Sequence, residues 1–407
     1  MKKRLMVMAM AGVALAGCVS DEVAEVVQKN EPEKIAFDGP VLYNNAESRA
    51  NVMGEYDAFN YPAGGGEKFP GTYSYPREEN FNVFSCLYSG DFSSWASGTN
   101  YWKSTCLTVY YDSNINGWTS ADTDPYYWPG NNQKLAFAAY SPADLGSDNG
   151  SVVPTYGANG LTVANFKISE TPSHQFELLY SERSLNNTAN QAGSTGFYNG
   201  VKIKFKHALS SIHFALKKDA DVSTPIYLRS VVLKNVMTQG TFNENLNETT
   251  NLASPMWTGQ TNPVNYTIYT AGSGSTGSIE FPALMPQHIH ELSASVDGDT
   301  STSLLVIPQS LPTDQGVNNI VVEVTYKIGT EPDDANNVKT VTVSVGNRTG
   351  KDIADNNNDI TVNSWLPGKK YTYVLHYSAH SEAKDKIYFA PEVSAWERVN
   401  QIYIDLY

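Results

Sequence analysis

Residues 320–328 read Ile-Val-Val-Glu-Val-Thr-Tyr-Lys-Ile, and this stretch decides the fold class. The apolar side chains share one parity: Ile320, Val322, Val324, Tyr326 and Ile328. Because successive side chains of a β-strand point to opposite faces, this alternation predicts a strand with one buried face. Glu323, Thr325 and Lys327 occupy the other parity and are expected to face solvent.

The same period of two recurs along the chain and predicts further strands. The stretches that carry it are 135–139, 201–206, 212–216, 279–283, 341–345 and 371–377. The apolar parity changes between Phe205 and Ile212, which predicts a bulge or bend near Ala208–Leu209. Asn/Asp/Gly clusters between these stretches are typical of turns. Since no long amphipathic helix interrupts the pattern, the chain is predicted to be all-β, with two antiparallel β-sandwich domains.

The first eighteen residues have the pattern of an export signal. Two lysines and an arginine precede an apolar run that is too short to remain as a transmembrane helix. The run ends in Leu15-Ala16-Gly17-Cys18, which resembles a bacterial lipobox, where the cysteine is acylated and the preceding peptide is removed. We therefore expect a lipoprotein signal peptide at residues 1–17 and a lipid anchor on Cys18. The alternative is an ordinary signal peptide or a membrane anchor.

Length, composition and charge define the rest of the organisation. Residues 18–49 begin with a polar, acidic tether and continue into an apolar first strand. The remaining chain is long enough for two domains, which we place at residues 50–220 and 221–407. The formal net charge of −14 argues against a nucleic-acid partner, because binding phosphates requires basic surface.

Two cysteines follow Cys18, at positions 86 and 106. In an oxidising compartment they could form a disulfide between Cys86 and Cys106, which would restrict the unfolded chain. Their apolar flanks are equally typical of buried strand residues, so the sequence leaves both alternatives open.

Three aromatic stretches together resemble the fimbrillin family. Tyr126-Tyr127-Trp128-Pro129 leads into the stretch 135–142, which is similar to a motif of fimbrillin-like proteins. Phe205-Lys206-His207-Ala208-Leu209 is similar to the F-x-H-A-L strand of the same proteins. Residues 365–373 are similar to their W-x-x-G-x-x-Y-x-Y strand. With the lipobox-like start, the resemblance covers nearly the whole chain.

The resemblance implies a type V pilin with two transthyretin-like β-sandwich domains. Such a pilin is exported as a lipoprotein to the outer membrane and surface of a Gram-negative bacterium, where an arginine-specific protease removes its first strand. A terminal strand from a neighbouring subunit then fills the groove by donor-strand exchange. The implied partners are further pilin subunits in a head-to-tail homopolymer with a role in adhesion. The membrane is a partner only through the lipid of the precursor, and no enzymatic activity or cofactor is implied.

This sequence has a candidate for each part of that mechanism. The removable strand would carry four apolar residues of one parity: Ile35, Phe37, Val41 and Tyr43. The cleaved bond would be Arg49–Ala50, because its polar flanks favour exposure. The donor strand would be the alternating tail with Ile402, Ile404 and Leu406. The alternatives are a solvated loop arginine at position 49 and a last strand fixed in its own sheet.

Other functions have weaker signals in this chain. The 25 tyrosines and seven tryptophans favour one competitor, a monomeric outer-membrane lipoprotein that binds glycans or host proteins. Fimbrial tip and anchor subunits share the architecture of stalk subunits, so all three roles stay open. The sequence contains no catalytic signature of a serine hydrolase, a phosphate-binding loop or a zinc protease. Neither Asp355-x-Asn357-x-Asp359 nor His288-Ile289-His290 completes a metal site, so we expect none.

Overall fold

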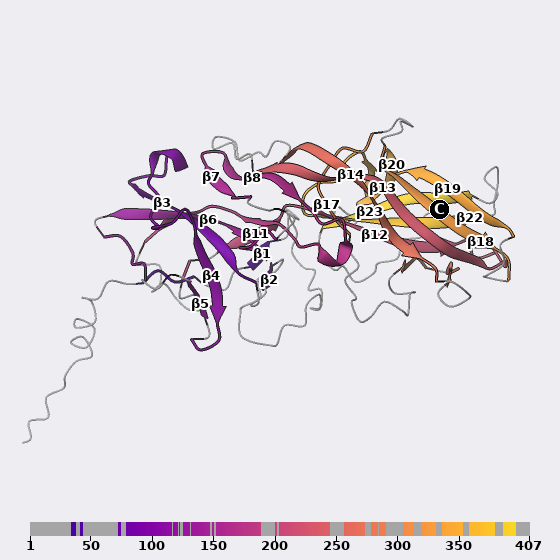
Figure 1. Ribbon diagram of the computed structural model, residues 1–407, viewed down its shortest axis with the longest axis horizontal. Helices are drawn as coiled ribbons and strands as arrows, with labels where there is room; N and C mark the ends of the chain where they lie inside the picture. The colour runs from indigo at the N-terminus through magenta and orange to yellow at the C-terminus, as the bar shows by residue number, and fades with distance from the viewer. Residues whose placement is uncertain are drawn as a thin grey trace, which may run out of the picture.

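The protein is an elongated all-β molecule, which confirms the fold class expected from the sequence (Figure 1). The computed structural model describes residues 34–37, 41–43, 72–74, 79–115, 117–120, 122, 125–130, 132–146, 149, 152–188, 200–201, 203–244, 256–272, 278–283, 285–289, 304–312, 319–330, 336–352, 358–378 and 386–395. Single 3₁₀ turns such as η1 (Trp95–Ser97) and η3 (Pro172–His174) interrupt the strands. No helix among these residues is long and apolar enough to cross a membrane.

The first sheet forms the N-terminal end of the molecule (Figure 1). Its strands are β1 (Val41–Tyr43), β2 (Thr72–Ser74), β3 (Phe81–Ser89), β4 (Leu107–Asp112), β5 (Gly117–Ser120), β6 (Gln133–Ser141), β9 (Leu179–Ser181), β10 (Ser184–Asn187) and β11 (Lys204–His207). The strand order is β2-β1-β11-β9-β6-β3-β4-β5, and β10 also pairs with β6. The central strand β3 is buried on both faces, because Phe81 and Val83 enter one core cluster and Phe84 enters another.

The second sheet extends along most of the molecule because β13 (Ile226–Asn243) is 18 residues long. Its other strands are β7 (Thr155–Gly157), β8 (Gly160–Lys167), β14 (Trp257–Thr270), β15 (Ile279–Glu280), β18 (Val321–Ile328) and β19 (Val338–Ser344). β18 pairs with the beginning of β13 and β8 pairs with its end. β13 therefore connects strands that come from both halves of the sequence.

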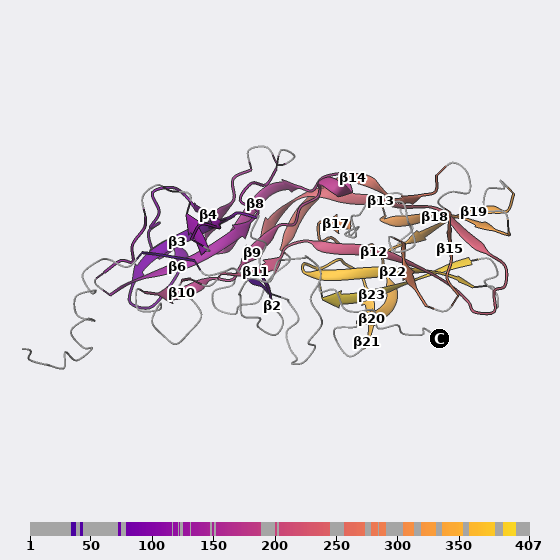
Figure 2. The same ribbon diagram turned by 90° about the horizontal axis from the view of Figure 1, so that it is seen from below.

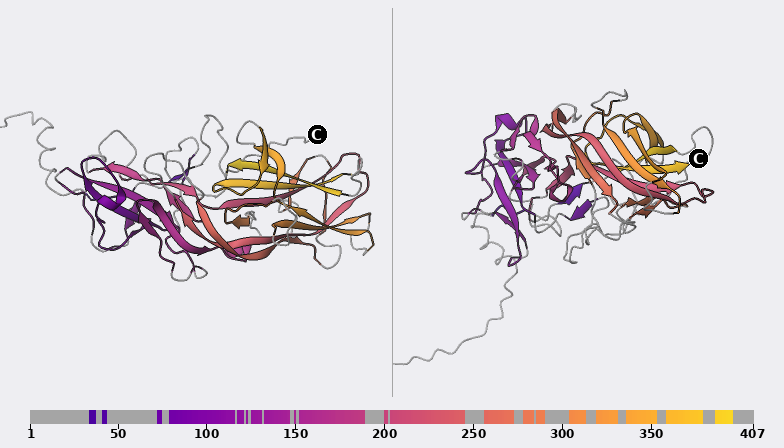
Figure 3. Two further views of the ribbon diagram at one scale, coloured as in Figure 1. Left: turned by 90° about the horizontal axis from the view of Figure 1, so that it is seen from above. Right: turned by 45° about the vertical axis from the view of Figure 1, so that its right-hand side comes forward.

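The third sheet packs against the second and forms a sandwich at the C-terminal end (Figures 2 and 3). Its strands are β12 (Ser210–Lys218), β16 (Gln287–His288), β17 (Leu304–Val306), β20 (Arg348–Asp352), β21 (Asn358–Val362), β22 (Lys369–Ser378) and β23 (Lys386–Ala395). The core between the two sheets includes Phe214 from β12, Val231 from β13, Val324 from β18 and Tyr373 from β22. The described partners of β12 are β16, β17 and β22, which all follow residue 220, although our expected boundary places β12 in the first domain.

The parity change near Ala208–Leu209 is a passage between sheets. β11 ends at His207 in the first sheet, and β12 begins at Ser210 in the third. The passage is held by a second aromatic motif, because Gly368 N donates a hydrogen bond of 2.8 Å to Leu209 O. Ser210 Oγ donates a further bond of 2.8 Å to Leu366 O. Two of the three stretches that resemble fimbrillins thus meet in space.

One expectation about the 320–328 stretch is wrong. The strand forms as β18, but Lys327 is only 2% exposed instead of facing solvent. Its ammonium group donates a hydrogen bond of 2.5 Å to Asn336 O in the connection between β18 and β19. A buried ammonium group is tolerated when it finds such an acceptor, and local alternation does not reveal it.

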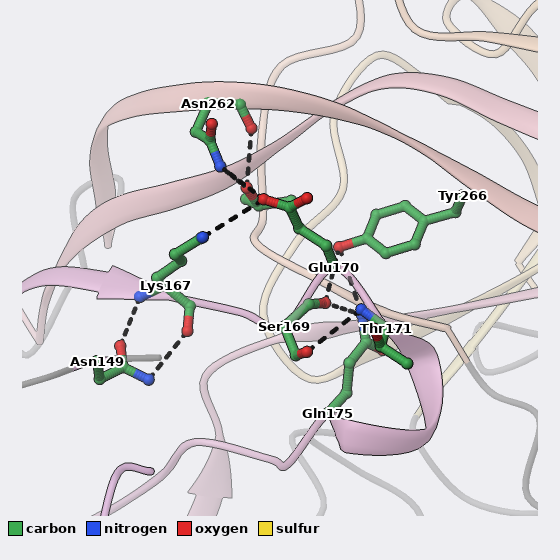
Figure 4. A network of polar contacts seen from close by, with 9 residues as sticks. Asn149, Lys167, Ser169, Glu170, Thr171, Gln175, Asn262 and Tyr266 are labelled. Atoms are coloured by element: carbon green, nitrogen blue, oxygen red, sulfur yellow. Dashed lines mark hydrogen bonds and ion pairs between the residues drawn. The ribbon is translucent and has the colours of Figure 1, made fainter. Parts of the chain in front are cut away.

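A polar network ties the segment around η3 to β14 of the second sheet (Figure 4). Gln175 Nε2 donates to Ser169 O at 3.0 Å, and Tyr266 OH on β14 donates to the same oxygen at 3.2 Å. Gln175 Oε1 accepts a 2.9 Å bond from Leu305 N on β17. The segment around η3 is therefore bonded to strands of two different sheets, β14 and β17.

Candidate functional site

Residues 34–37 lie between the two ends of the first sheet. Phe37 forms an antiparallel bridge to Trp118 of β5 and a parallel bridge to Val201, just before β11. Because β5 ends the sheet on one side and β11 lies near its other side, these residues close the sheet on itself. We call the place occupied by residues 34–37 and 41–43 the first-strand slot.

The backbone of residues 34–37 is bonded on both of its edges. Ile35 N donates a hydrogen bond of 2.8 Å to Tyr126 O on one side. On the other side, Val201 N donates a bond of 2.8 Å to Ala36 O. A segment paired on two sides behaves as an interior strand of a sheet, so its exit would leave polar groups unpaired on both neighbours.

Phe37 is the central apolar contact of the slot. Its side chain is 6% exposed and belongs to the core cluster of the first sheet. Its ring packs edge-on against Phe81 at a centroid distance of 6.3 Å and against Phe137 at 5.9 Å. Edge-to-face pairs add to the free energy of burying the rings, so Phe37 holds its segment in one position.

Gly200 allows the backbone of the segment to approach closely. A Cβ atom at this position would lie 2.6 Å from Ala36 O and 2.7 Å from the carbonyl carbon of Phe37. These are backbone atoms, which cannot move aside as the end of a side chain could. Residue 200 is therefore glycine for a steric reason that involves the first strand.

β1 continues the slot with a changed register. It pairs parallel to β11, with Val41 opposite Lys204 and Leu42 opposite Phe205, and antiparallel to β2. Four positions separate Phe37 from Val41, whereas three separate their partners Val201 and Lys204. The pairing register therefore shifts by one residue between Phe37 and Val41. The shared burial of Ile35, Phe37, Val41 and Tyr43 stays a prediction.

The phenol groups of Tyr101 and Tyr126 beside the slot are hydrogen-bonded and neutral. Tyr126 OH accepts a 3.0 Å bond from Lys103 N and donates a 2.8 Å bond to Asp122 Oδ2. Tyr101 OH donates a 2.5 Å bond to Tyr127 O. Burial raises the pKa of both phenols, so they remain neutral. These features suit the binding of an apolar strand.

The family comparison agrees with this architecture. The model of the fimbrillin-like family matches residues 90–396, which is most of the chain. The chain belongs to the fimbrillin-like family. This confirms the resemblance found in the sequence, and it supports the role of a fimbrial subunit. No curated protein sequence matches this fimbrillin-like chain.

The chain is similar to solved structures of fimbrial proteins. A fimbrial protein from Bacteroides vulgatus has a TM-score of 0.52 at 15% identity, with 89% of this chain and 99% of that chain covered. A fimbrilin from Porphyromonas gingivalis has a TM-score of 0.38 at 10% identity, covering 91% and 99%. The tip fimbrial protein of the same organism has a TM-score of 0.36 at 9% identity, covering 79% and 95%. At 15% identity, the likeness to the Bacteroides vulgatus protein concerns the fold alone.

The structure brings together part of the predicted site of this fimbrillin-like protein. Ile35 and Phe37 lie in the slot, and Val41 and Tyr43 lie in β1. The remaining predicted residues lie outside the described ranges: Cys18, Arg49, Ala50, Ile402, Ile404 and Leu406. Lipidation, cleavage and strand donation therefore stay predictions. Among the described residues, no group of three His, Cys, Asp or Glu side chains could hold a metal ion.

Cys86 and Cys106 are free thiols in the structure. Cys86 Sγ donates a 3.5 Å hydrogen bond to Trp95 O and lies against Gly98. Cys106 is hydrogen-bonded to Tyr140 instead. Burial raises the pKa of both thiols, which keeps them protonated. Of the two alternatives that the sequence left open, the structure has the packed thiols and no disulfide.

Sequence reasoning missed the lining of the slot. Phe81, Phe137 and Trp118 come from β3, β6 and β5, and Gly200 precedes β11. Alternation on β6 did indicate that Phe137 is buried. Nothing local shows that Phe137 faces Phe37, which is 100 positions earlier, since that contact depends on the closure of the sheet.

Proposed function

We propose that the protein is a structural subunit of a cell-surface fimbria with a role in adhesion. It is exported as a lipoprotein through Cys18, cleaved after Arg49, and polymerised head-to-tail by donor-strand exchange. Membership of the fimbrillin-like family supports the coarser part of this proposal, the fimbrial role and the cell-surface location. The finer part rests on the first-strand slot.

The observation that carries the proposal is the closure of the first sheet by residues 34–37. Phe37 bridges Trp118 and Val201, and its ring contacts Phe81 and Phe137. Loss of this segment would leave a groove lined by aromatic rings, with unpaired backbone groups on both sides. An extended apolar strand restores both the burial and the hydrogen bonds, which is the physical basis of β-augmentation.

The geometry of the interface follows from the position of the slot. An extended C-terminal tail of one copy that enters the slot of the next makes a heterologous contact. Such contacts leave a free slot and a free tail at opposite ends, so they propagate into a fibre. The tail residues Ile402, Ile404 and Leu406 supply the alternating apolar side chains that this requires.

Mass spectrometry of the mature N-terminus tests the proposal directly. Protein recovered from the cell surface is expected to begin at Ala50. A chain that begins at acylated Cys18 and binds a glycan or host protein as a monomer would contradict it. That result would instead support a surface-binding lipoprotein.

A charge in the donor strand is expected to stop assembly. Ile404→Asp would place a carboxylate in an apolar groove without a partner, and the desolvation cost opposes insertion. We expect electron microscopy to show no filaments of the Ile404→Asp chain. Tyr403→Asp, on the other parity of the tail, is the matched control and should still polymerise. Filaments of normal length from Ile404→Asp would exclude the tail as donor.

A further inference from the structure

We propose that Phe37 anchors the first-strand slot, so that the resident strand stays bound after the chain is cut on its C-terminal side. The strand then leaves only when it is displaced by another strand with a large apolar side chain at the same position. This inference rests on the proposed function, and it concerns the step between cleavage and assembly. It makes cleavage and release two separate events.

The first argument is that the resident segment is held by more than its covalent connection. Ile35 N and Ala36 O are bonded to Tyr126 and Val201 on opposite sides. Cutting after Arg49 breaks none of these bonds, because the cut lies on the far side of β1. β1 is itself paired with β11 and with β2, which adds backbone bonds on two further edges.

The second argument is the depth at which Phe37 is packed. Its ring lies in the same cluster as Phe81, Phe137, Phe205 and Trp118. Phe81 also packs against Trp118 at 5.4 Å and against Phe205 at 5.6 Å, so the rings form one connected group. Withdrawal of Phe37 would open a cavity in the middle of this group, which is the costly part of release.

The third argument concerns register. The backbone of the segment approaches Gly200 at Ala36–Phe37, where a Cβ atom at position 200 would collide with it. The close approach and the ring pocket therefore lie at the same point of the slot. An incoming strand has to place a large apolar side chain there, because a slip by one residue would turn that side chain to the opposite face.

The experiment uses the full chain with residues 46–50 replaced by the recognition sequence of a site-specific protease. This separates the test from the identity of the natural protease. After cutting, size-exclusion chromatography and native mass spectrometry report whether the N-terminal fragment is retained. We expect the fragment to co-elute with the rest of the chain. Its loss on the first passage through the column would overturn the proposal.

A displacement assay tests the role of Phe37 without any substitution in the lining of the slot. The cut chain is mixed with a fluorescent peptide of residues 30–45, and uptake is followed by anisotropy. We expect the Phe37→Ala peptide to bind at least about a hundredfold more weakly than the natural sequence, since the ring pocket stays empty. Lys34→Ala removes an exposed side chain and is the control, with an effect within about twofold. Equal uptake of the Phe37→Ala and natural peptides would contradict the proposal that Phe37 anchors the strand.

A pair of glycine variants tests the register argument. Gly200→Ala is expected to release the fragment after cutting, whereas Gly130→Ala, where an added Cβ meets nothing within 4 Å, should retain it. Retention in both variants would contradict the role of Gly200. Failure of the proposed function is a different result: retention and exchange as expected, with a chain that starts at Cys18 on cells and forms no filaments.

Discussion

The Phe37→Ala chain, uncut and full-length, is expected to lose about 3–5 kcal/mol of its free energy of unfolding. The ring is 6% exposed, and its removal leaves a cavity bounded by Phe81 and Phe137, which belong to rigid strands and cannot collapse into it. Urea unfolding followed by tryptophan fluorescence measures the change, and Trp118 in the same cluster provides a local signal. A loss below about 1 kcal/mol would mean that the segment is only loosely held.

Two matched variants separate a local effect from a general one. Ile35→Ala truncates a half-buried side chain in the same segment and should cost less, about 1–2 kcal/mol. Phe166→Ala removes a fully buried ring from a different cluster. Only Phe37→Ala should speed hydrogen exchange at the amides of Ile35 and Val201 under native conditions, because the Ile35 donor and the Ala36 acceptor of Val201 N both belong to the segment. Faster exchange at these amides in Phe166→Ala would show that the slot opens only with the whole molecule.

The sequence was sufficient to predict the strands because their signal is local. β18 alternates with one face in the core, and β6 was indicated by Leu135, Phe137 and Ala139. The three aromatic motifs were sufficient to identify the fimbrillin-like family. β12 and β22 show the limit, since most side chains on both of their faces are buried. Alternation of apolar and polar residues identifies a strand, but it does not show whether the other face of that strand is also buried.

The candidate site was only partly predictable, because its two sides come from distant parts of the chain. Phe37 could be predicted as an apolar strand residue from the alternation of the residues around it. The role of Gly200 could not, because it depends on the position of the Ala36 backbone in the folded protein. The register shift between Phe37 and Val41 likewise depends on pairing with Val201 and Lys204. Such non-local contacts leave no periodic signal in either segment.

Glu244 is the largest departure from its sequence context. It follows β13 in the polar stretch Asn243-Glu244-Asn245, yet it is 3% exposed. Its Oε2 accepts a 2.8 Å bond from Leu161 N, and its own amide donates a 2.8 Å bond to Leu161 O. Gly160, with φ +88°, leaves room for the carboxyl group, since a Cβ there would lie 2.4 Å from Oε2. The carboxyl group thus joins the β7–β8 turn to the end of β13.

The surroundings of Glu244 predict a stability that depends on pH. Burial raises its pKa from 4.5 to about 7, against the opposing effects of the Leu161 amide, Arg183, Tyr156 and Lys206. The folded state therefore keeps its proton to a higher pH than the unfolded state does. The stabilisation is complete below about pH 4.5 and is lost as the pH rises through 7. From the two pKa values, the loss amounts to about 3 kcal/mol, as an upper bound.

Glu244→Gln is expected to remove this dependence. The amide keeps an oxygen acceptor for Leu161 N and cannot ionise, so the variant should gain stability over the natural chain as the pH rises from 5 to 8. Urea unfolding at both pH values measures the difference. Glu170→Gln, at an exposed carboxylate that pairs with Lys167, controls for the loss of one negative charge. If the two variants follow the same pH course, the buried carboxyl group is not the cause. If only Glu244→Gln flattens the curve, protonation of this single group sets how firmly the β7–β8 turn is held to the end of β13.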